Sequence, residues 1–172
     1  MNEHHIAIIG AGTMGNGIAQ VCALAGVNAV MVDISDAATA KGVATVTASL
    51  DRLIKKEKLS EADKAAALAR IVTSTSYDAL KAADIVIEAA TENHELKVKI
   101  LKQVDALVGP EVIIASNTSS ISITQLAAAT SRRASAWDRR QLPHTPRHRS
   151  IKKKRTSNLN WARKPASVCL TV

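Results

Sequence analysis

The sequence predicts a doubly wound α/β domain, in which helices cover both faces of a parallel β-sheet. Short apolar runs alternate with longer amphipathic runs from residue 6 to about residue 131. The apolar runs have the length of buried strands, and the runs between them repeat apolar residues at the three- and four-residue spacing of helices. Strands that alternate with helices in this way favour parallel pairing through right-handed crossovers.

A glycine-rich turn at residues 10–15 joins the first expected strand, residues 6–9, to the first expected helix, residues 18–25. Its GxGxxG spacing gives a tight turn at Gly10, no side chain between backbone and ligand at Gly12, and close packing of helix on strand at Gly15. The free N–H groups of the helix start suit the phosphates of a dinucleotide. We therefore expect a dinucleotide to bind at Gly10, Ala11, Gly12, Thr13, Met14 and Gly15.

An acidic residue makes this prediction more specific. The first helix stops at Gly26, and the second expected strand, residues 29–32, is followed by Asp33. A carboxylate about 20 positions beyond the first glycine accepts hydrogen bonds from the adenosine ribose. Because it also repels a 2′-phosphate, Asp33 favours NAD over NADP. The alternative is that Asp33 only caps the next helix.

The remaining elements follow in chain order. A long helix begins at Ser35 or Asp36 and ends in the lysine-rich segment 55–58, where the helix dipole favours cations. The other expected elements are helices at residues 60–70, 93–108 and 123–129 and strands at residues 71–73, 84–90 and 112–115. Together they predict a Rossmann-type sheet that is incomplete, since a sixth strand is doubtful.

The pattern stops after Ser131. Residues 1–131 contain 11 Lys and Arg against 14 Asp and Glu, whereas residues 132–172 contain 12 against 1, so the net charge of +8 comes from the last segment. We predict a domain over residues 1–131 and a disordered basic tail over residues 132–172. Dense Arg, Pro and Trp without any period also suggest an out-of-frame reading of a GC-rich gene, which is our hypothesis for the tail.

Composition narrows the class of protein. The chain has no run of 18 or more apolar residues, and no signal-peptide pattern precedes the first strand. We expect a cytoplasmic protein without a membrane partner. Cys22 and Cys169 provide neither metal-ligand spacing nor a disulfide framework, so no metal site is expected.

Several segments together resemble the amino-terminal domain of the L-3-hydroxyacyl-CoA dehydrogenases, of the bacterial 3-hydroxybutyryl-CoA dehydrogenase type. They are the glycine-rich turn, Asp33, residues 88–99 and, most specifically, the Ser-Asn-Thr-Ser-Ser sequence at residues 116–120. The resemblance covers about residues 6–131. It implies NAD-dependent oxidation of the 3-hydroxyl of an acyl-CoA, or the reverse reduction, in fatty acid and butanoate metabolism.

The resemblance also implies roles near the reacting end of NAD. Glu92 and Lys97 match residues near the nicotinamide half, and Asn117 lies in the strand-end loop beside the cofactor. Ser119 matches the serine that hydrogen-bonds the 3-oxygen of the substrate. Spacing alone allows two alternatives. Glu92 and Lys97 could form an exposed helical pair, and Ser119 and Ser120 could cap the following helix.

A second set of residues is implied for the CoA portion of the substrate. Ser49 and Lys56, on the long second helix, match positions that contact CoA, together with Ser119. A lysine suits a ligand that carries phosphates. The alternative for Lys56 is that it belongs to a solvated, lysine-rich helix end.

The resemblance fails beyond Ser131. The family has a strand there that leads to a His-Phe-Phe-Asn-Pro motif, whose histidine is the general base. Arg140 stands at the aligned position, and an arginine cannot take up a proton. The carboxyl-terminal helical domain through which the family dimerises is also absent, so we expect this chain alone to be inactive.

Two other functions remain open. The chain could be a binding module that retains NAD or CoA without catalysis. The basic tail, with Trp137 and Trp161 available for stacking, could instead bind nucleic acid. We rank this last and expect no specific nucleic-acid partner, because unpatterned positive charge binds polyanions without selection.

Overall fold

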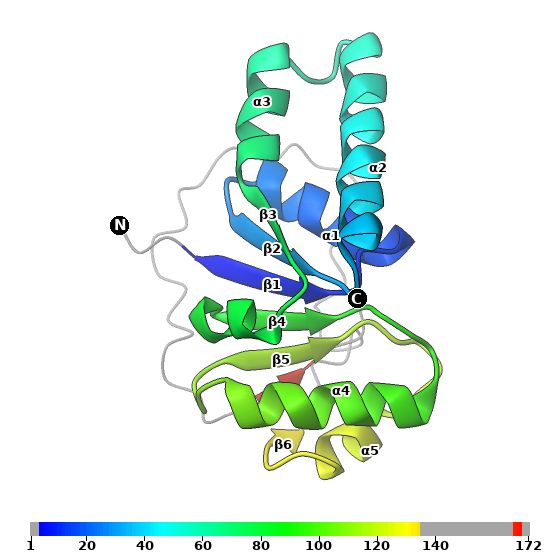
Figure 1. Ribbon diagram of the computed structural model, residues 1–172, viewed down its shortest axis with the longest axis vertical. Coiled ribbons are helices and arrows are strands. Elements are labelled where there is room, and N and C mark those ends of the chain that lie inside the picture. The colour runs from blue at the N-terminus through cyan, green and yellow to red at the C-terminus, as the bar shows by residue number, and fades with distance from the viewer. Residues whose placement is uncertain (1–3, 135–166, 170–172) are drawn as a thin grey trace, which may run out of the picture.

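The computed structural model describes residues 4–134 and 167–169. The strands formed by these residues make one sheet with the order β3-β2-β1-β4-β5-β7-β6 (Figure 1). All neighbouring strands are parallel. The chain first adds strands on one side of β1 and then crosses to the other side, so the order reverses between β1 and β4. This arrangement confirms the predicted doubly wound, Rossmann-type fold.

Five strands make up the centre of the sheet. They are β1 His5–Ile9, β2 Asn28–Val32, β3 Ile71–Ser74, β4 Ile85–Glu88 and β5 Ile113–Ser116. Each lies at a predicted strand. Ile8 packs into the apolar cluster under α1, whereas Ala7 and Ile9 belong to the cluster on the opposite face. Both faces of the sheet are therefore buried, which explains why the strands read as continuous apolar runs.

The helices divide between the two faces. They are α1 Thr13–Leu24, α2 Asp36–Lys55, α3 Glu61–Ala69, the 3-10 helix η1 Tyr77–Ala82, α4 His94–Leu107 and α5 Ile123–Ala128. Residues of α1, α2 and α3 pack in two neighbouring clusters, and residues of η1, α4 and α5 pack in the third. Figure 1 shows the same division, with α2 and α3 projecting as a pair from one end of the domain.

Short polar side chains determine where the longer helices begin. Ser35, Ser60 and Asn93 each accept a hydrogen bond from the backbone N–H three residues further on. Such caps satisfy one of the unpaired donors of the first turn. Ser35, and not Asp36, therefore caps α2.

The sequence pattern does not predict η1, because six residues are too few to show helical periodicity. Ser76 caps it by accepting a hydrogen bond from the N–H of Asp78 at 3.1 Å. Tyr77 packs, partly buried, against the apolar cluster that contains α4. This burial, together with the negative charges of Glu88 and Asp33, raises the pKa of the Tyr77 hydroxyl.

Ordered structure continues past the predicted boundary at Ser131. Arg132 is only 7% exposed, and its Nε donates to Asp105 Oδ1 at 2.6 Å. Its two terminal nitrogens donate to the carbonyls of Val108, Gly109 and Val112. Arg132 therefore belongs to the folded domain and not to a disordered tail, since it closes the turn between α4 and β5.

Two short strands extend the sheet beyond β5. β7, Ser167–Cys169, pairs with β5 in the sixth position, and β6, Arg133–Ala134, pairs with β7. The other predictions for the tail, including those for Arg140, Trp137 and Trp161, concern residues outside the described ranges.

The described residues contain neither a membrane-spanning helix nor a cluster of metal ligands. In residues 4–134 and 167–169, no helix is long and apolar enough to cross a membrane. The same residues contain no group of three or more His, Cys, Asp or Glu side chains that could hold a metal ion. Cys22 is partly buried against the apolar cluster of α1, and this burial raises the pKa of its thiol.

The contact between Asp105 and the chain at Ser131–Arg132 should make stability depend on pH. Burial opposes ionisation of Asp105, but hydrogen bonds from the Ser131 N–H and the Arg132 guanidinium outweigh it and lower the pKa. A carboxyl in the unfolded chain titrates near pH ~4. The stabilisation is therefore complete above that pH and is lost as the pH falls through the lower folded pKa.

We expect urea unfolding to show that Asp105→Asn destabilises the protein clearly at pH 6 and much less at pH 2.5. An equal loss at both pH values would contradict this account.

Candidate functional site

The glycine-rich turn brings three stretches of backbone into close contact. Gly10 has φ +103°, and a Cβ there would lie 2.7 Å from both the carbonyl oxygen of Ala89 and the Cα of Ala90. A Cβ on Gly15 would lie 1.7 Å from the carbonyl oxygen of Gly10. The predicted tight turn and the predicted close helix packing are both present, and no residue larger than glycine fits at either position.

Gly12 differs from these two glycines because it faces open space. A Cβ added there would find no atom within 4 Å. Gly12 is also the N-cap of α1, and as a glycine it offers no side chain to bond the N–H groups of the first turn. Exposed N–H groups at a helix start attract anionic groups, and the helix dipole adds to this attraction. The open side of Gly12 therefore fits a pyrophosphate.

Asp33 joins the end of β2 to the glycine-rich turn. Its Oδ2 accepts a hydrogen bond from the Ala11 N–H at 2.7 Å, and its Oδ1 accepts from the Ile34 N–H at 2.7 Å. The cap of α2 is Ser35, so the alternative that Asp33 caps this helix is wrong. The carboxylate is only partly buried and stands beside the turn, where the sequence predicts the adenosine ribose.

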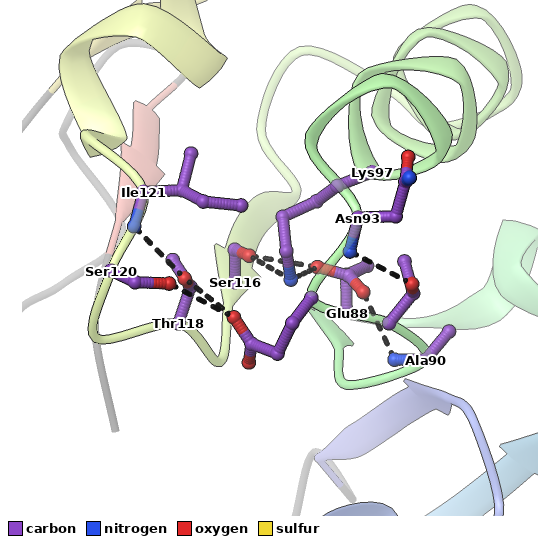
Figure 2. A network of polar contacts seen from close by, with 10 residues as sticks. Glu88, Ala90, Asn93, Lys97, Ser116, Thr118, Ser120 and Ile121 are labelled. Carbon is purple, nitrogen blue, oxygen red and sulfur yellow. Dashed lines mark hydrogen bonds and ion pairs between the residues drawn. The ribbon is translucent and has the colours of Figure 1, made fainter.

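A buried polar network lies beneath the adjacent loops, after β4 and β5 (Figure 2). The side chains of Glu88 and Lys97 are 0% exposed and form an ion pair. Ser116 Oγ donates to Glu88 Oε2 at 2.8 Å and accepts from Lys97 Nζ at 3.1 Å. Glu88 Oε1 accepts from the Ala90 N–H at 2.9 Å. The network ties β4, α4 and β5 together, and no buried side-chain polar atom of the described residues lacks a partner.

This burial changes the interpretation of Lys97. The alternative that Lys97 forms an exposed pair with Glu92 is wrong, because its ammonium lies in the interior against Glu88 and Ser116. With no exposed surface, its side chain has no open face for the predicted cofactor contact. The signal for this pairing was a glutamate inside the apolar run of β4, because a buried carboxylate requires a partner.

Glu92, in the loop after β4, connects this loop to the one after β5. Its Oε2 accepts hydrogen bonds from Thr118 Oγ1 at 3.2 Å and from Ser120 Oγ at 3.3 Å. Glu92 is exposed, and none of the ion pairs among the described residues involves it. The carboxylate thus holds the residues on either side of Ser119.

Ser119 is exposed, and no hydrogen bond of its hydroxyl is found within the part of the chain that the structure describes. The helix that follows begins at Ile123 with Ser122 as its N-cap. The alternative that Ser119 and Ser120 cap this helix is therefore wrong. Asn117, at the start of the same loop, donates its N–H to the carbonyl of Glu88 at 2.7 Å, which fixes the loop against the end of β4.

Ser49 and Lys56 lie apart from these loops, on and just after α2. Ser49 is partly buried and Lys56 is exposed. Their seven-residue spacing corresponds to two helical turns, so both lie on one face of the helix about 10 Å apart along its axis. The exposure of Lys56 is compatible both with a ligand contact and with a solvated helix end.

The sheet order arranges the other predicted residues in a row. Asp33 follows β2, the glycine-rich turn follows β1, Glu92 follows β4 and Ser119 follows β5. All four strands are parallel and adjacent, so these segments leave the same edge of the sheet side by side. Ligands of doubly wound sheets bind at this edge, where the strand order reverses. Here the reversal lies between β1 and β4, next to Gly12.

Comparison with known proteins identifies close relatives of this arrangement. The family profile described as "3-hydroxyacyl-CoA dehydrogenase, NAD binding domain" matches residues 5–137. A 3-hydroxybutyryl-CoA dehydrogenase of Bradyrhizobium diazoefficiens is 49% identical over 127 residues, which are 74% of this chain and 43% of the relative. A fatty acid oxidation complex subunit alpha of Acinetobacter baylyi is 44% identical over 126 residues, 73% of this chain and 18% of the relative.

A solved structure agrees with these relatives. The crystal structure of (S)-3-hydroxybutyryl-CoA dehydrogenase PaaH1 from Ralstonia eutropha superposes with a TM-score of 0.75 at 76% sequence identity. The match covers 76% of this chain and 46% of that protein. This chain therefore spans less than half the length of each of these relatives.

The buried ion pair gives a testable prediction about stability. We expect Lys97→Met to lower the free energy of unfolding by about 3–5 kcal/mol, because it leaves the Glu88 carboxylate buried without a counter-charge. The double variant Glu88→Gln, Lys97→Met should cost less than Lys97→Met alone, since no charge is then left unpaired. Urea denaturation measures all three proteins. A double variant less stable than Lys97→Met would refute this account.

Proposed function

The chain belongs to the 3-hydroxyacyl-CoA dehydrogenase family, and on this premise we propose that it forms the cofactor half of an NAD-dependent dehydrogenase acting on 3-hydroxyacyl-CoA esters such as 3-hydroxybutyryl-CoA. One observation carries most of the argument. Gly12 opens onto free space at the start of α1, directly beside the Ala11 N–H that Asp33 binds. The chain thus provides a binding position for a pyrophosphate at Gly12. This position lies next to the Asp33 carboxylate, which suits a ribose without a 2′-phosphate.

The order of the loops along the edge of the sheet implies which end of NAD lies over which strands. With the adenosine ribose at Asp33 and the pyrophosphate at Gly12, the nicotinamide end extends over β4 and β5. When bound there, NAD accepts a hydride from the carbon that carries the substrate hydroxyl. Glu92, Asn117 and Ser119 are three of the polar residues in the two loops at that end.

Ser119 is proposed to hydrogen-bond the 3-oxygen of the substrate. Its hydroxyl is exposed, and its neighbours Thr118 and Ser120 are both held by Glu92. A side chain on a loop fixed from both sides can orient a substrate without first being ordered itself. Ser49 and Lys56 are proposed to contact the CoA portion, with Lys56 as a point charge for a phosphate.

Further proposals follow from the family. We assign the protein to fatty acid and butanoate metabolism, because relatives are named 3-hydroxybutyryl-CoA dehydrogenase and fatty acid oxidation complex subunit alpha. We also propose that it acts in the cytoplasm. We place the functional domain boundary soon after Arg132, which is buried against the turn between α4 and β5. Dimerisation of the family, by resemblance, uses a helical domain that follows this one.

Gly12 allows a test of cofactor binding that is separate from folding. Gly12→Ala should leave the melting temperature nearly unchanged, because its φ is −66° and its Cβ meets no protein atom. It should weaken NADH binding at least ~10-fold, since a methyl group replaces the space where the backbone meets the pyrophosphate. Fluorescence titration with NADH measures the dissociation constant.

Gly17→Ala is the matched control, because a Cβ added there would also meet no atom within 4 Å, and it should bind NADH normally. Normal NADH binding by Gly12→Ala would reject this site.

Turnover by the chain alone should be very low. By the resemblance, Arg140 takes the position of the family's general base, and general-base catalysis contributes roughly 10² to 10⁴ in rate. We therefore expect NADH binding without appreciable NADH oxidation when acetoacetyl-CoA is added, as absorbance at 340 nm would record. An ordinary enzymatic rate would show that another residue supplies the proton. Binding without turnover would also distinguish this proposal from a chain that binds no cofactor.

A further inference from the structure

We propose that the Glu92 carboxylate shifts the cofactor preference of this site toward oxidised NAD⁺ and away from reduced NADH, by acting on the charge of the nicotinamide ring. This inference rests on the proposed function, because it requires the nicotinamide to lie over β4 and β5. The two cofactors carry the same adenosine and pyrophosphate and differ at the nicotinamide, which is cationic in NAD⁺ and neutral in NADH. A nearby unbalanced negative charge therefore discriminates between them.

Among the carboxylates at this edge of the sheet, Glu88, Asp33 and Glu92 are not equivalent. The charge of Glu88 is balanced by Lys97 in a pair with no exposed surface. Asp33 lies beyond β1, at the adenosine end of the row, where the two cofactors are identical. Glu92 alone of the three combines a place at the nicotinamide end with the absence of any ion pair in the described ranges.

The partners of Glu92 leave its charge intact. Both hydrogen bonds to its Oε2 come from neutral hydroxyls, those of Thr118 and Ser120 (Figure 2). These bonds orient the carboxylate without supplying a positive charge, and the hydroxyls belong to the loop that carries Ser119. A held carboxylate keeps its position when the ligand enters, so its field acts on the cofactor without a reorganisation cost.

The Coulomb interaction sets the expected size of the effect. For unit charges several ångströms apart in an exposed site, it corresponds to about a threefold to tenfold ratio of dissociation constants. The same factor applies to the equilibrium between the bound cofactors, because binding and reduction form a closed thermodynamic cycle. Glu92 then favours NAD⁺ as the bound product of substrate reduction.

The test is to titrate the full chain with NAD⁺ and with NADH by calorimetry. We expect Glu92→Gln to weaken NAD⁺ binding about threefold to tenfold and to change NADH binding less than twofold. The amide retains an oxygen for the Thr118 and Ser120 hydroxyls, so the loop geometry should survive. Glu111→Gln removes an equal charge at the amino end of β5 and should leave both constants unchanged.

A second measurement uses the unaltered chain. Raising the salt concentration to 1 M shortens the Debye length to about 3 Å and should reduce the preference for NAD⁺ toward that of Glu92→Gln. Salt effects on the shared pyrophosphate cancel in the ratio of the two constants.

Two results would overturn the proposal. Equal weakening of NAD⁺ and NADH in Glu92→Gln would mean that Glu92 contacts or positions the cofactor without discriminating its charge. Unchanged dissociation constants for both cofactors would mean that the nicotinamide lies outside the field of Glu92. In both cases the chain still binds cofactor and the proposed function stands, whereas an unaltered chain that binds neither cofactor at millimolar concentration refutes both.

Discussion

The contact of backbone on backbone around Gly10 is the constraint on which the site depends. The end of β1, the end of β4 and the first turn of α1 approach so closely that a single added carbon would overlap at Gly10 or Gly15. The N–H of Gly10 also donates to the carbonyl of Val32 at 2.7 Å, which ties β2 into the same point. Because these contacts involve main-chain atoms, side-chain rearrangement cannot relieve an added Cβ.

The polar network after β4 and β5 extends this rigidity to the other end of the site. Glu88 receives the Ala90 N–H, and Ala90 is one of the residues against which Gly10 packs. The ion pair with Lys97 is not by itself a reason for high stability, because burying two charges costs nearly as much as their attraction returns. Its effect here is geometric. Apolar replacements would still fill the space, but they would not define where the backbone at Ala90 must lie.

Most of the fold could be predicted from local sequence, and the exceptions have physical reasons. The glycine-rich turn and Asp33 were predictable because each is required by backbone geometry within one β-α-β unit. Burial of Lys97 was not, since its partner Glu88 lies nine residues away and on a different element, and lysines are usually exposed. Arg132 was assigned to the tail because charge composition is averaged over a long segment. Its burial instead depends on three carbonyls and one carboxylate, which the turn after α4 brings together around its guanidinium.

The reversal of strand order between β1 and β4 also affects how the domain is made. β1 pairs with β2 across 23 positions but with β4 across 79, as the partners of Ile6 show. During synthesis, the first half of the sheet can therefore form while one edge of β1 is still unpaired. Contacts of long sequence separation form slowly, and an open strand edge is where a nascent chain associates with others. The edge of β1 that later pairs with β4 is thus exposed to misassembly until residue 88 leaves the ribosome.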